Sequence, residues 1–320
     1  MKSDILLETK QLKKYYGTVH AVDGVSLSIQ KGQSLGLIGE SGSGKSTFGK
    51  LVTKLEKPSG GEICFLGRSV ENMPERKFRP LRKEIQIVFQ SSVDVFDPCY
   101  TVGDSIRECL HNYTNLSPAE IEDCLDETFE MVGLNPALKN RAARQLSGGQ
   151  CQRANIARAL VLQPQLIVCD EPVSSLDYSI RKQMLNLLNE IQEQQGITYL
   201  FITHDLSNVP YVCKAVAIMY HGRIVEYLDH TDDLGENVMH PYSRLLFESV
   251  PVPDPRKRTI IRELPERVQA ENFQKGCPFR GECPIQEEIC AEIMPLLSEE
   301  SAGHKVACHC LHKIKNIRNM

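Results

Sequence analysis

The sequence predicts an α/β fold with a largely parallel central sheet and one phosphate-binding edge. Three observations predict it. Residues 39–47 (GESGSGKST) fit G-x-x-x-x-G-K-[ST], and they lie between a short apolar strand and a helical pattern. Apolar strand-like runs also precede Asp170-Glu171 and His204. Because open parallel sheets present ligand groups at the carboxyl ends of their strands, these polar residues are expected to share one site.

The glycine-rich stretch predicts nucleotide binding. In a P-loop the backbone N–H groups wrap the phosphates, and the N-terminus of the following helix adds a partial positive charge. Glycines allow close approach and unusual backbone angles. The predicted ATP-binding residues of this loop are Gly39, Glu40, Ser41, Gly42, Ser43, Gly44, Lys45, Ser46 and Thr47.

Composition limits the kind of protein this is. The 320 residues carry 37 basic and 41 acidic side chains, a formal charge of -4, so no nucleic-acid partner is expected. No apolar run approaches the ~18 residues of a membrane span. The first residues lack a signal-peptide core. We therefore expect a cytosolic chain whose membrane role depends on partner subunits.

The elements around these motifs follow in a clear order. Residues 5–30 have the alternation and turns of an antiparallel sheet, with Tyr15-Tyr16 in one of its loops. A buried strand ends at Gln90. Residues 101–145 show helical spacing without strand signals, which predicts a helical insertion. The insertion ends at a polar glycine loop, residues 146–150 (LSGGQ), that opens another helix.

Paired carboxylates at the end of a buried strand suit a nucleotide site. Asp170 lies where Mg²⁺ can be held, and Glu171 beside it can act on a water molecule. With Gly39, Gln90 and His204, four separate strands deliver polar groups to one edge. The sequence therefore predicts a single composite site at that edge.

A second candidate site lies near the C-terminus. Of twelve cysteines, five fall between residues 277 and 310. In a reducing compartment such a cluster suggests metal before disulfides. The spacing Cys277-x5-Cys283-x6-Cys290-x17-Cys308 offers four thiolates for an iron–sulfur cluster or a structural Zn²⁺. A third alternative is that this segment binds no metal.

Taken together, the motifs resemble the nucleotide-binding subunit of an ABC transporter. The likeness covers residues 5 to about 250, and LSGGQ at this distance before LIVCDEP is nearly diagnostic. Within that family the chain is similar to the ATPases of oligopeptide and dipeptide importers. The residues that carry the narrower likeness are 170–174, 198–206, 219–220 and 240–242, with 276–279, 283–284 and 303–309 in the C-terminal segment.

The resemblance implies a role for each site residue. Lys45 would contact the β- and γ-phosphates. Ser46 and Asp170 would hold Mg²⁺, and Gln90 would link Mg²⁺ and the attacking water to the membrane-facing side. The remaining roles fall to Glu171, which would polarise the water, His204, which would contact the γ-phosphate, and Tyr16, which would stack on adenine with Tyr15 as second choice.

The resemblance also implies an assembly. Ser147, Gly148, Gly149 and Gln150 would face the ATP held by a second ABC ATPase subunit, for which a paralogue is favoured, and Asp177 would form the D-loop. Two transmembrane permease subunits and an extracytoplasmic solute-binding protein would complete it, with this chain peripheral on the cytoplasmic face of the cell membrane. In relatives of this importer group the cysteine segment is associated with [4Fe-4S].

The sequence thus predicts an α/β P-loop ATPase with an N-terminal antiparallel β subdomain, a helical insertion and a small cysteine-rich C-terminal extension. The nucleotide-binding domain would span residues 1–252, with the helical subdomain at about 91–150, and the extension 253–320. The expected function is ATP hydrolysis, to ADP and phosphate, that energises an importer of oligopeptides or dipeptides. A nickel or other small-solute importer is the alternative.

A soluble ABC ATPase of DNA repair or translation is a more distant alternative. The single P-loop, the single LSGGQ and the lack of a heptad run disfavour it. A degenerate regulatory subunit is disfavoured because Glu171 and His204 are intact. Ser175, Tyr178 and Cys151 depart from the family pattern, but none of these changes removes a catalytic group.

Overall fold

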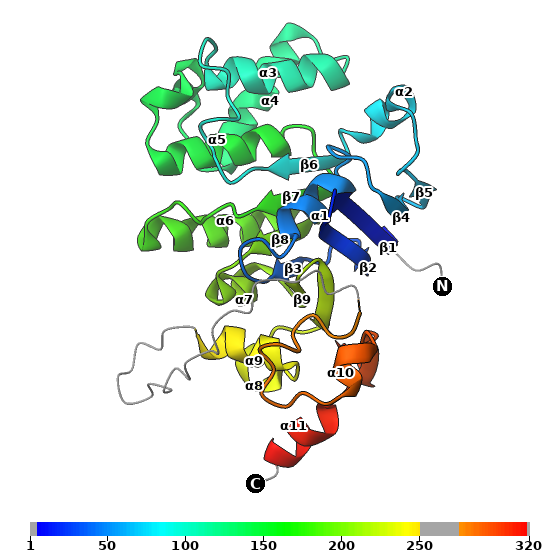
Figure 1. The fold of residues 1–320 in the computed structure, drawn as a ribbon. Helices are drawn as coiled ribbons and strands as arrows, with labels where there is room; N and C mark the ends of the chain where they lie inside the picture. The colour runs from blue at the N-terminus through cyan, green and yellow to red at the C-terminus, as the bar shows by residue number, and fades with distance from the viewer. Residues whose placement is uncertain (1–4, 250–274, 319–320) are drawn as a thin grey trace.

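Two β-sheets form the frame of the molecule in the computed structural model, which describes residues 5–249 and 275–318 (Figure 1). An antiparallel four-stranded sheet has the order β2-β1-β4-β5, and an eight-stranded sheet has the order β11-β12-β10-β9-β3-β8-β7-β6. The strands of the smaller sheet are β1 (Ile5–Tyr16), β2 (Val19–Gln30), β4 (Gly60–Phe65) and β5 (Arg68–Ser69). The predicted N-terminal antiparallel β subdomain is therefore confirmed.

The middle of the large sheet is parallel, as the sequence predicts. Its strands β3, β8, β7 and β6 are neighbours in that order, and each pairs in parallel with the next. Their carboxyl ends therefore lie along one edge, which brings the P-loop, Gln90, Asp170 and His204 together. The bounds are β3 (Leu35–Ile38), β6 (Ile85–Val88), β7 (Leu166–Asp170) and β8 (Thr198–Thr203).

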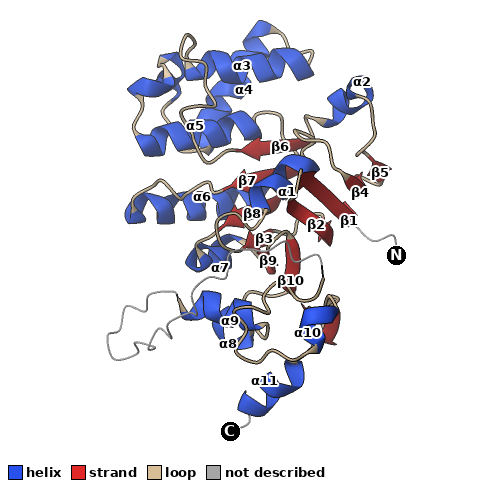
Figure 2. Ribbon diagram, viewed as in Figure 1, coloured by secondary structure: helices blue, strands red, loops and turns tan. Residues whose placement is uncertain are grey.

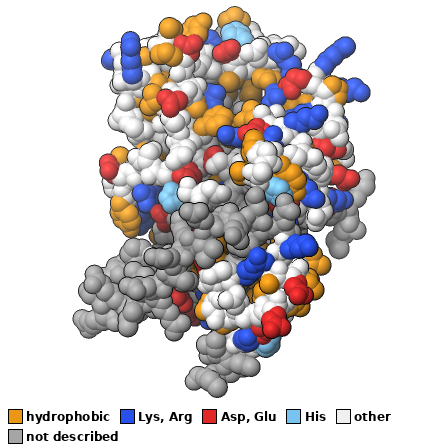
Figure 3. Space-filling model, viewed as in Figure 1, with side chains coloured by type: hydrophobic (Ala, Val, Ile, Leu, Met, Phe, Trp, Pro, Cys, Tyr) orange, Lys and Arg blue, Asp and Glu red, His pale blue; other side chains and the backbone are white. Residues whose placement is uncertain are grey.

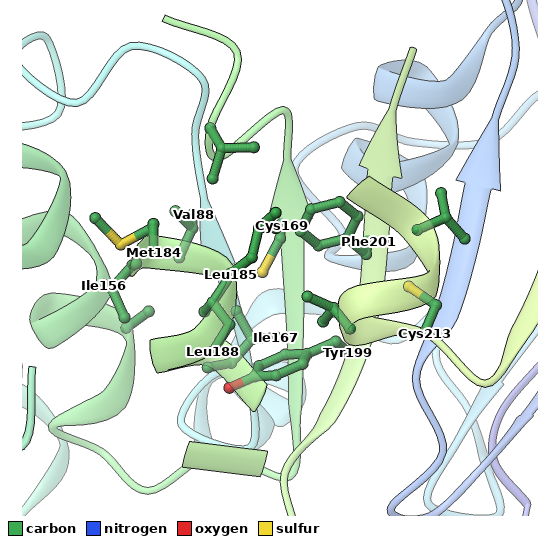
Figure 4. Packing of buried hydrophobic residues seen from close by; sticks show 14 of the residues in the cluster. Val88, Ile156, Ile167, Cys169, Met184, Leu185, Leu188, Tyr199, Phe201 and Cys213 are labelled. Carbon is green, nitrogen blue, oxygen red and sulfur yellow. The ribbon is translucent and has the colours of Figure 1, made fainter. Parts of the chain in front are cut away.

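This sheet is buried on both faces, so its strands alternate between two cores. Leu200 and Ile202 of β8 pack with α1 (Lys45–Val52) and the small sheet. Tyr199 and Phe201 point the opposite way, into the core shared with α5, α6 and α7 (Figure 4). The side-chain period of two in a strand produces this division. A strand covered on both faces accordingly reads as a continuous apolar run.

The predicted helical insertion lies beyond β6 (Figure 2). It contains α3 (Val102–Tyr113) and α4 (Pro118–Met131), followed by α5 (Gly148–Leu160). Capping boxes begin all three helices, because the side chain of the residue before each helix accepts from the N3 backbone N–H. The other helices are α2 (Glu75–Phe78), α6 (Tyr178–Gln195), α7 (Val209–Val212), α8 (Leu234–Asn237) and α9 (Pro241–Glu248).

The C-terminal segment continues the large sheet. Strand β12 (His304–Val306) pairs antiparallel with β10 (Arg223–Leu228), which pairs with β9 (Ala215–Tyr220). The remaining elements are α10 (Ile289–Glu292), β11 (Ser298–Ser301) and α11 (Leu311–Arg318). The predicted domain boundary at residue 252 lies outside the described residues. Among the helices that the structure describes, none is long and apolar enough to cross a membrane.

Candidate nucleotide site

A cavity of about 830 Å³ lies at the carboxyl edge of the parallel strands. The P-loop forms its floor, and three other strand ends contribute Gln90, Glu171 and His204. Its further lining residues come from β2, β10 and the turn before it, α9 and the C-terminal extension: Val19, His20, Ala21, Asp23, His221, Arg223, Leu246 and Pro278. Gly39, Gln90 and His204, which the sequence predicts at this edge of the sheet, therefore line one cavity.

Two glycines let the P-loop fit between neighbouring backbones. Gly39 has φ +153°, and a Cβ there would collide with the carbonyl oxygen of Met219 on β9. Gly44 has φ +104°, and a Cβ there would collide with the carbonyl oxygen of Ala21 on β2. Both positions combine a backbone angle that side chains disfavour with no room for a methyl group. The loop is thus held between the two sheets.

Lys45 places its ammonium group within the loop. The Nζ donates to the carbonyl oxygens of Gly39, at 2.8 Å, and Glu40, at 2.7 Å. Burial lowers the pKa of Lys45, and the carboxylates of Glu171 and Asp170 oppose that shift. A largely buried cation enclosed by backbone carbonyls attracts phosphate oxygens strongly, because little water screens it.

Ser46 and Asp170 offer oxygen ligands side by side. The Ser46 hydroxyl donates to Oδ1 of Asp170 over 2.8 Å. Burial raises the pKa of Asp170, although the Ser46 hydrogen bond favours its ionised form. A bound divalent cation would favour the ionised form of Asp170 further. Carboxylate and hydroxyl oxygens suit Mg²⁺, which in nucleotide sites is held by one or two protein oxygens plus phosphates. These two residues fit the predicted role.

Glu171 is held between two other predicted catalytic side chains, Gln90 and His204. Its Oε1 lies 2.8 Å from Nδ1 of His204, and its Oε2 accepts from Nε2 of Gln90 over 3.0 Å. Glu171 has φ +49°, a left-handed conformation that is strained for a side-chain-bearing residue. The backbone thereby turns away from β7 at the residue that is predicted to act on water.

The signature loop lies outside this cavity. Ser147 begins α5, and its Oγ accepts from the N–H of Gln150 while the Gln150 side chain accepts from the N–H of Ser147. Ser147 and Gly148 are exposed, as is Asp177 at the start of α6. A Cβ on Gly149 would lie 3.0 Å from Ile180, so the signature loop and the start of α6 are neighbours. Among the described residues lining the cavity, none belongs to this loop.

Comparison with known proteins identifies the family. Residues 22–174 match the family model for the ABC transporter, and residues 225–290 match that for the oligopeptide/dipeptide transporter, C-terminal region. The oligopeptide transport ATP-binding protein AppF of Bacillus subtilis is 42% identical over 96% of this chain and 97% of its own length. The chain belongs to the oligopeptide-transport ATP-binding proteins of the ABC family. OppF of Salmonella typhimurium is 40% identical over 95% of this chain and 96% of its own.

Solved ABC cassettes share the fold of this ATPase. The chain superposes on cbiO1 from Clostridium perfringens with a TM-score of 0.64 at 31% identity, covering 70% of this chain and 88% of that one. The cassette MJ0796 bound to ADP and Pi gives a TM-score of 0.63 at 28% identity, covering 68% and 96%. As an ABC ATPase the chain uses ATP and Mg²⁺.

The predicted adenine-stacking residue lies at the rim of the cavity. Tyr16 is 46% exposed and does not line the cavity, and its hydroxyl donates to Glu56. The ring of Tyr15 stacks on His20, with centroids 3.9 Å apart. His20 is the aromatic side chain of this pair that lines the cavity. Assignment of the base platform to Tyr16 therefore stays a prediction.

The cysteine segment does not form a metal-ligand set in the described residues. All twelve cysteines are free thiols, and no group of three or more His, Cys, Asp or Glu side chains within 5–249 and 275–318 is arranged to hold a metal ion. A thiol contact joins Cys290 and Cys310 at 3.7 Å; Cys310 is, with His309, a spare candidate beside the four predicted ligands. Burial raises the pKa of Cys277 to about 11 and that of Cys308 to about 12. As arranged, the thiols do not fit the expected ligand shell.

Sequence reasoning missed the contribution of the C-terminal region to the cavity. Leu246 of α9 and Pro278 of the extension line it, and the Tyr242 hydroxyl contacts the P-loop backbone. In the sequence, residues 240–242 carry a family likeness and no local signal of this contact. No local pattern could place Tyr242 beside a loop some 200 residues earlier, because that contact depends on the complete fold.

Proposed function

We propose that this ATPase hydrolyses ATP to ADP and phosphate to energise import of oligopeptides or dipeptides. The observation that carries the proposal is Glu171, which the strained end of β7 presents to the cavity between Gln90 and His204. The near-full-length likeness to two oligopeptide transport ATP-binding proteins supports the peptide class of solute.

The site residues divide the chemistry among them. The P-loop N–H groups and Lys45 bind the phosphates, and Ser46 with Asp170 would hold Mg²⁺, which supplies charge stabilisation when bound. The carboxylate of Glu171 accepts a proton from the attacking water. A positioned general base contributes about 10²–10⁴ in rate. Gln90 and His204 orient that carboxylate through its two oxygens.

A second ABC ATPase, favoured as a paralogue, would complete each nucleotide site. Supporting this, Ser147, Gly148 and Asp177 are exposed and lie on adjacent elements, away from the chain's own cavity. In such a pair the signature loop of each chain would close on the ATP of the other. Two permease subunits and an extracytoplasmic solute-binding protein would make up the rest of the importer, with this chain at the cytoplasmic face of the membrane. On the face shown in Figure 3, basic and acidic side chains are interspersed in the described part.

Transport assays test the proposed function. In membrane vesicles containing the assembled importer, ATP inside should drive uptake of labelled peptide, and the Glu171→Gln chain should not support it. Uptake of nickel with no uptake of any peptide would replace the peptide assignment by its alternative. ATP turnover without uptake of any solute would favour a soluble ABC ATPase.

The expectation of [4Fe-4S] or Zn²⁺ at Cys277, Cys283, Cys290 and Cys308 stays a prediction, and no role in hydrolysis is derived from it. Anaerobic purification followed by iron, sulfide and zinc analysis tests it. Roughly equal iron and sulfide, about four of each per chain, is expected for the cluster. About one zinc per chain would favour the alternative, and a metal-free protein with an ordered extension would refute both.

A further inference from the structure

Helix α9 touches the P-loop through one hydroxyl group. The backbone N–H of Glu40 donates a hydrogen bond of 2.9 Å to the hydroxyl oxygen of Tyr242. Tyr242 is 2% exposed, so water does not compete for this contact. The partner sits one residue after Gly39, where the chain leaves β3 and begins the loop.

The contact fixes the orientation of a peptide group used by the site. Lys45 donates to the Gly39 carbonyl oxygen over 2.8 Å, while the Tyr242 hydroxyl accepts from the Glu40 N–H of the same peptide group. The peptide group between Gly39 and Glu40 is therefore held at both its carbonyl and its N–H. Without the Tyr242 hydroxyl, the Glu40 N–H would lose this hydrogen bond, and the backbone at the start of the loop would reach more conformations. Only a fraction of those conformations would hold Lys45 and the loop N–H groups ready for phosphates.

The C-terminal extension holds the ring of Tyr242 in place. Phe279, which is 2% exposed, packs against Tyr242 with centroids 5.7 Å apart and against Tyr220 at 5.4 Å. Tyr242 and Tyr220 lie 4.4 Å apart. The Tyr220 hydroxyl donates to Glu282 of the extension over 3.0 Å. One aromatic cluster thus joins the extension, β9 and α9 beside the P-loop.

A buried carboxylate ties the start of α9 to the same extension. Glu226 of β10 is fully buried, and its oxygens accept from the N–H groups of Met239 and His240. Its Oε1 also lies 2.7 Å from Nε2 of His304 on β12. His240 in turn caps α9, because its Nδ1 accepts from the N–H of Tyr242 over 3.1 Å. In Figure 2, α9 and α10 are drawn next to β10.

We propose that Tyr242 is a positioning residue for the P-loop and that the extension sets its place through Phe279. Tyr242 acts on the nucleotide through the Glu40 peptide group. The extension would therefore contribute to ATP affinity without supplying a phosphate ligand. This inference rests on the proposed function, because it assumes that the P-loop binds ATP; titration of the unaltered full chain with ATP tests that assumption separately.

Tyr242→Phe tests the hydroxyl alone, since it keeps the ring. The matched control is Tyr199→Phe, because Tyr199 is equally buried and its hydroxyl has no hydrogen-bond partner among the described residues. Figure 4 shows the ring of Tyr199 among apolar side chains. In calorimetric titrations of the full chain, Tyr242→Phe should weaken ATP binding by about 2- to 10-fold, the range expected of one hydrogen bond. Tyr199→Phe should bind like the wild type.

Two further readouts separate positioning from mere stability. At saturating ATP, the assembled importer with Tyr242→Phe should keep its kcat while its KM for ATP rises. Hydrogen exchange of the peptide containing Glu40 should quicken in Tyr242→Phe and not in Tyr199→Phe. A Tyr242→Phe chain with wild-type ATP affinity would overturn the proposal, as would an equal loss of affinity in both variants.

A double-mutant cycle tests the role of the extension. Phe279→Leu keeps an apolar side chain in the cluster but removes the ring that touches Tyr242, and it should also weaken ATP binding. If Phe279 acts through Tyr242, adding Phe279→Leu to Tyr242→Phe should cause little further loss. Fully additive losses would show that Phe279 acts elsewhere and would overturn that half of the proposal.

Discussion

The carboxyl edge of the central sheet supplies the nucleotide cavity with charged and polar side chains, whereas the C-terminal region contacts the backbone of the P-loop. Lys45 and Glu171 line the cavity directly, and Asp170 ends β7 just before Glu171. Tyr242 instead contacts a backbone N–H of that loop. The side chains that line the cavity thus lie near strand ends, whereas the backbone conformation of the P-loop also depends on residues that only the complete fold brings close.

The two regions also treat buried charge differently. At the strand edge, Lys45 and Asp170 have lost part of their hydration where phosphates bind. This burial lowers the pKa of Lys45 and raises that of Asp170. In the C-terminal region the Glu226 carboxylate is met by three partners, and His240 is kept neutral. A functional site can leave the burial of its charged groups partly uncompensated, whereas a buried structural carboxylate has its hydrogen-bond partners within the protein.

The strongest test of the strand edge is Glu171→Gln. The substitution keeps the shape of the side chain but removes the base, so ATP turnover should fall by at least about 100-fold. ATP binding should persist, because the P-loop and Lys45 are untouched, and an ATP-bound dimer should accumulate. Phosphate release and nucleotide binding measure the two effects. Glu62→Gln, an exposed carboxylate on β4, is the control; wild-type turnover in Glu171→Gln would remove Glu171 from the mechanism.

A second test compares two glycines. Gly44→Ala forces a side chain onto φ +104° and against the Ala21 carbonyl, and it should lower the free energy of unfolding by about 2–4 kcal/mol. Gly148→Ala meets open space without a positive φ, so its stability should stay within about 0.5 kcal/mol of wild type. Denaturant unfolding measures both.

The same pair separates folding from the role proposed for the signature loop. In the assembled importer, Gly148→Ala should lower turnover while leaving the chain's own ATP affinity unchanged, because Gly148 would face the partner's nucleotide. A loss of ATP affinity in the isolated Gly148→Ala chain would argue against that arrangement.

Local sequence signals predicted which residues lie at the carboxyl edge of the sheet. They did not predict how the C-terminal region packs beside the P-loop. The P-loop, Gln90, Asp170 and His204 could be placed because each lies at or near the carboxyl end of an apolar strand, and parallel strands align their ends. The addition of β12 to the sheet beside β10 could not be predicted, because short polar strands such as β11 and β12 carry little hydrophobic pattern. The thiol arrangement was likewise beyond the sequence, since spacing does not fix side-chain geometry.

Acid should weaken the C-terminal region through His240. Complete burial lowers its pKa to about 4 from the ordinary 6.5, although Glu226 nearby favours protonation. Below pH 6.5 the unfolded chain therefore binds a proton that the folded chain refuses, and this contribution to stability is lost as the pH falls toward 4. The loss amounts to at most about 3 kcal/mol.

The variant His240→Asn isolates this effect. Asparagine can still accept from the Tyr242 N–H at the start of α9 and does not titrate. Denaturant unfolding between pH 7 and pH 4 should show a shallower decline for His240→Asn than for wild type, with the Glu226–His304 contact present in both. Equal slopes would mean that His240 is protonated in the folded chain.

The smallest expected effect concerns the base platform, the least determined part of the strand-edge site. If Tyr16 stacks on adenine, Tyr16→Ala should weaken ATP binding by about tenfold, and Tyr16→Phe should have almost no effect, because stacking needs the ring and not the hydroxyl that contacts Glu56. If instead the stacked pair of Tyr15 and His20 receives the base, the loss should follow His20→Ala. Titration of all three variants with ATP and with GTP separates these outcomes.

A platform at Tyr16 would require the base to extend past the lining residues to the rim, next to Thr47 at the end of the loop. The strand-edge site would then also depend on the small sheet, through a residue at the end of β1 that no strand-end argument could have placed.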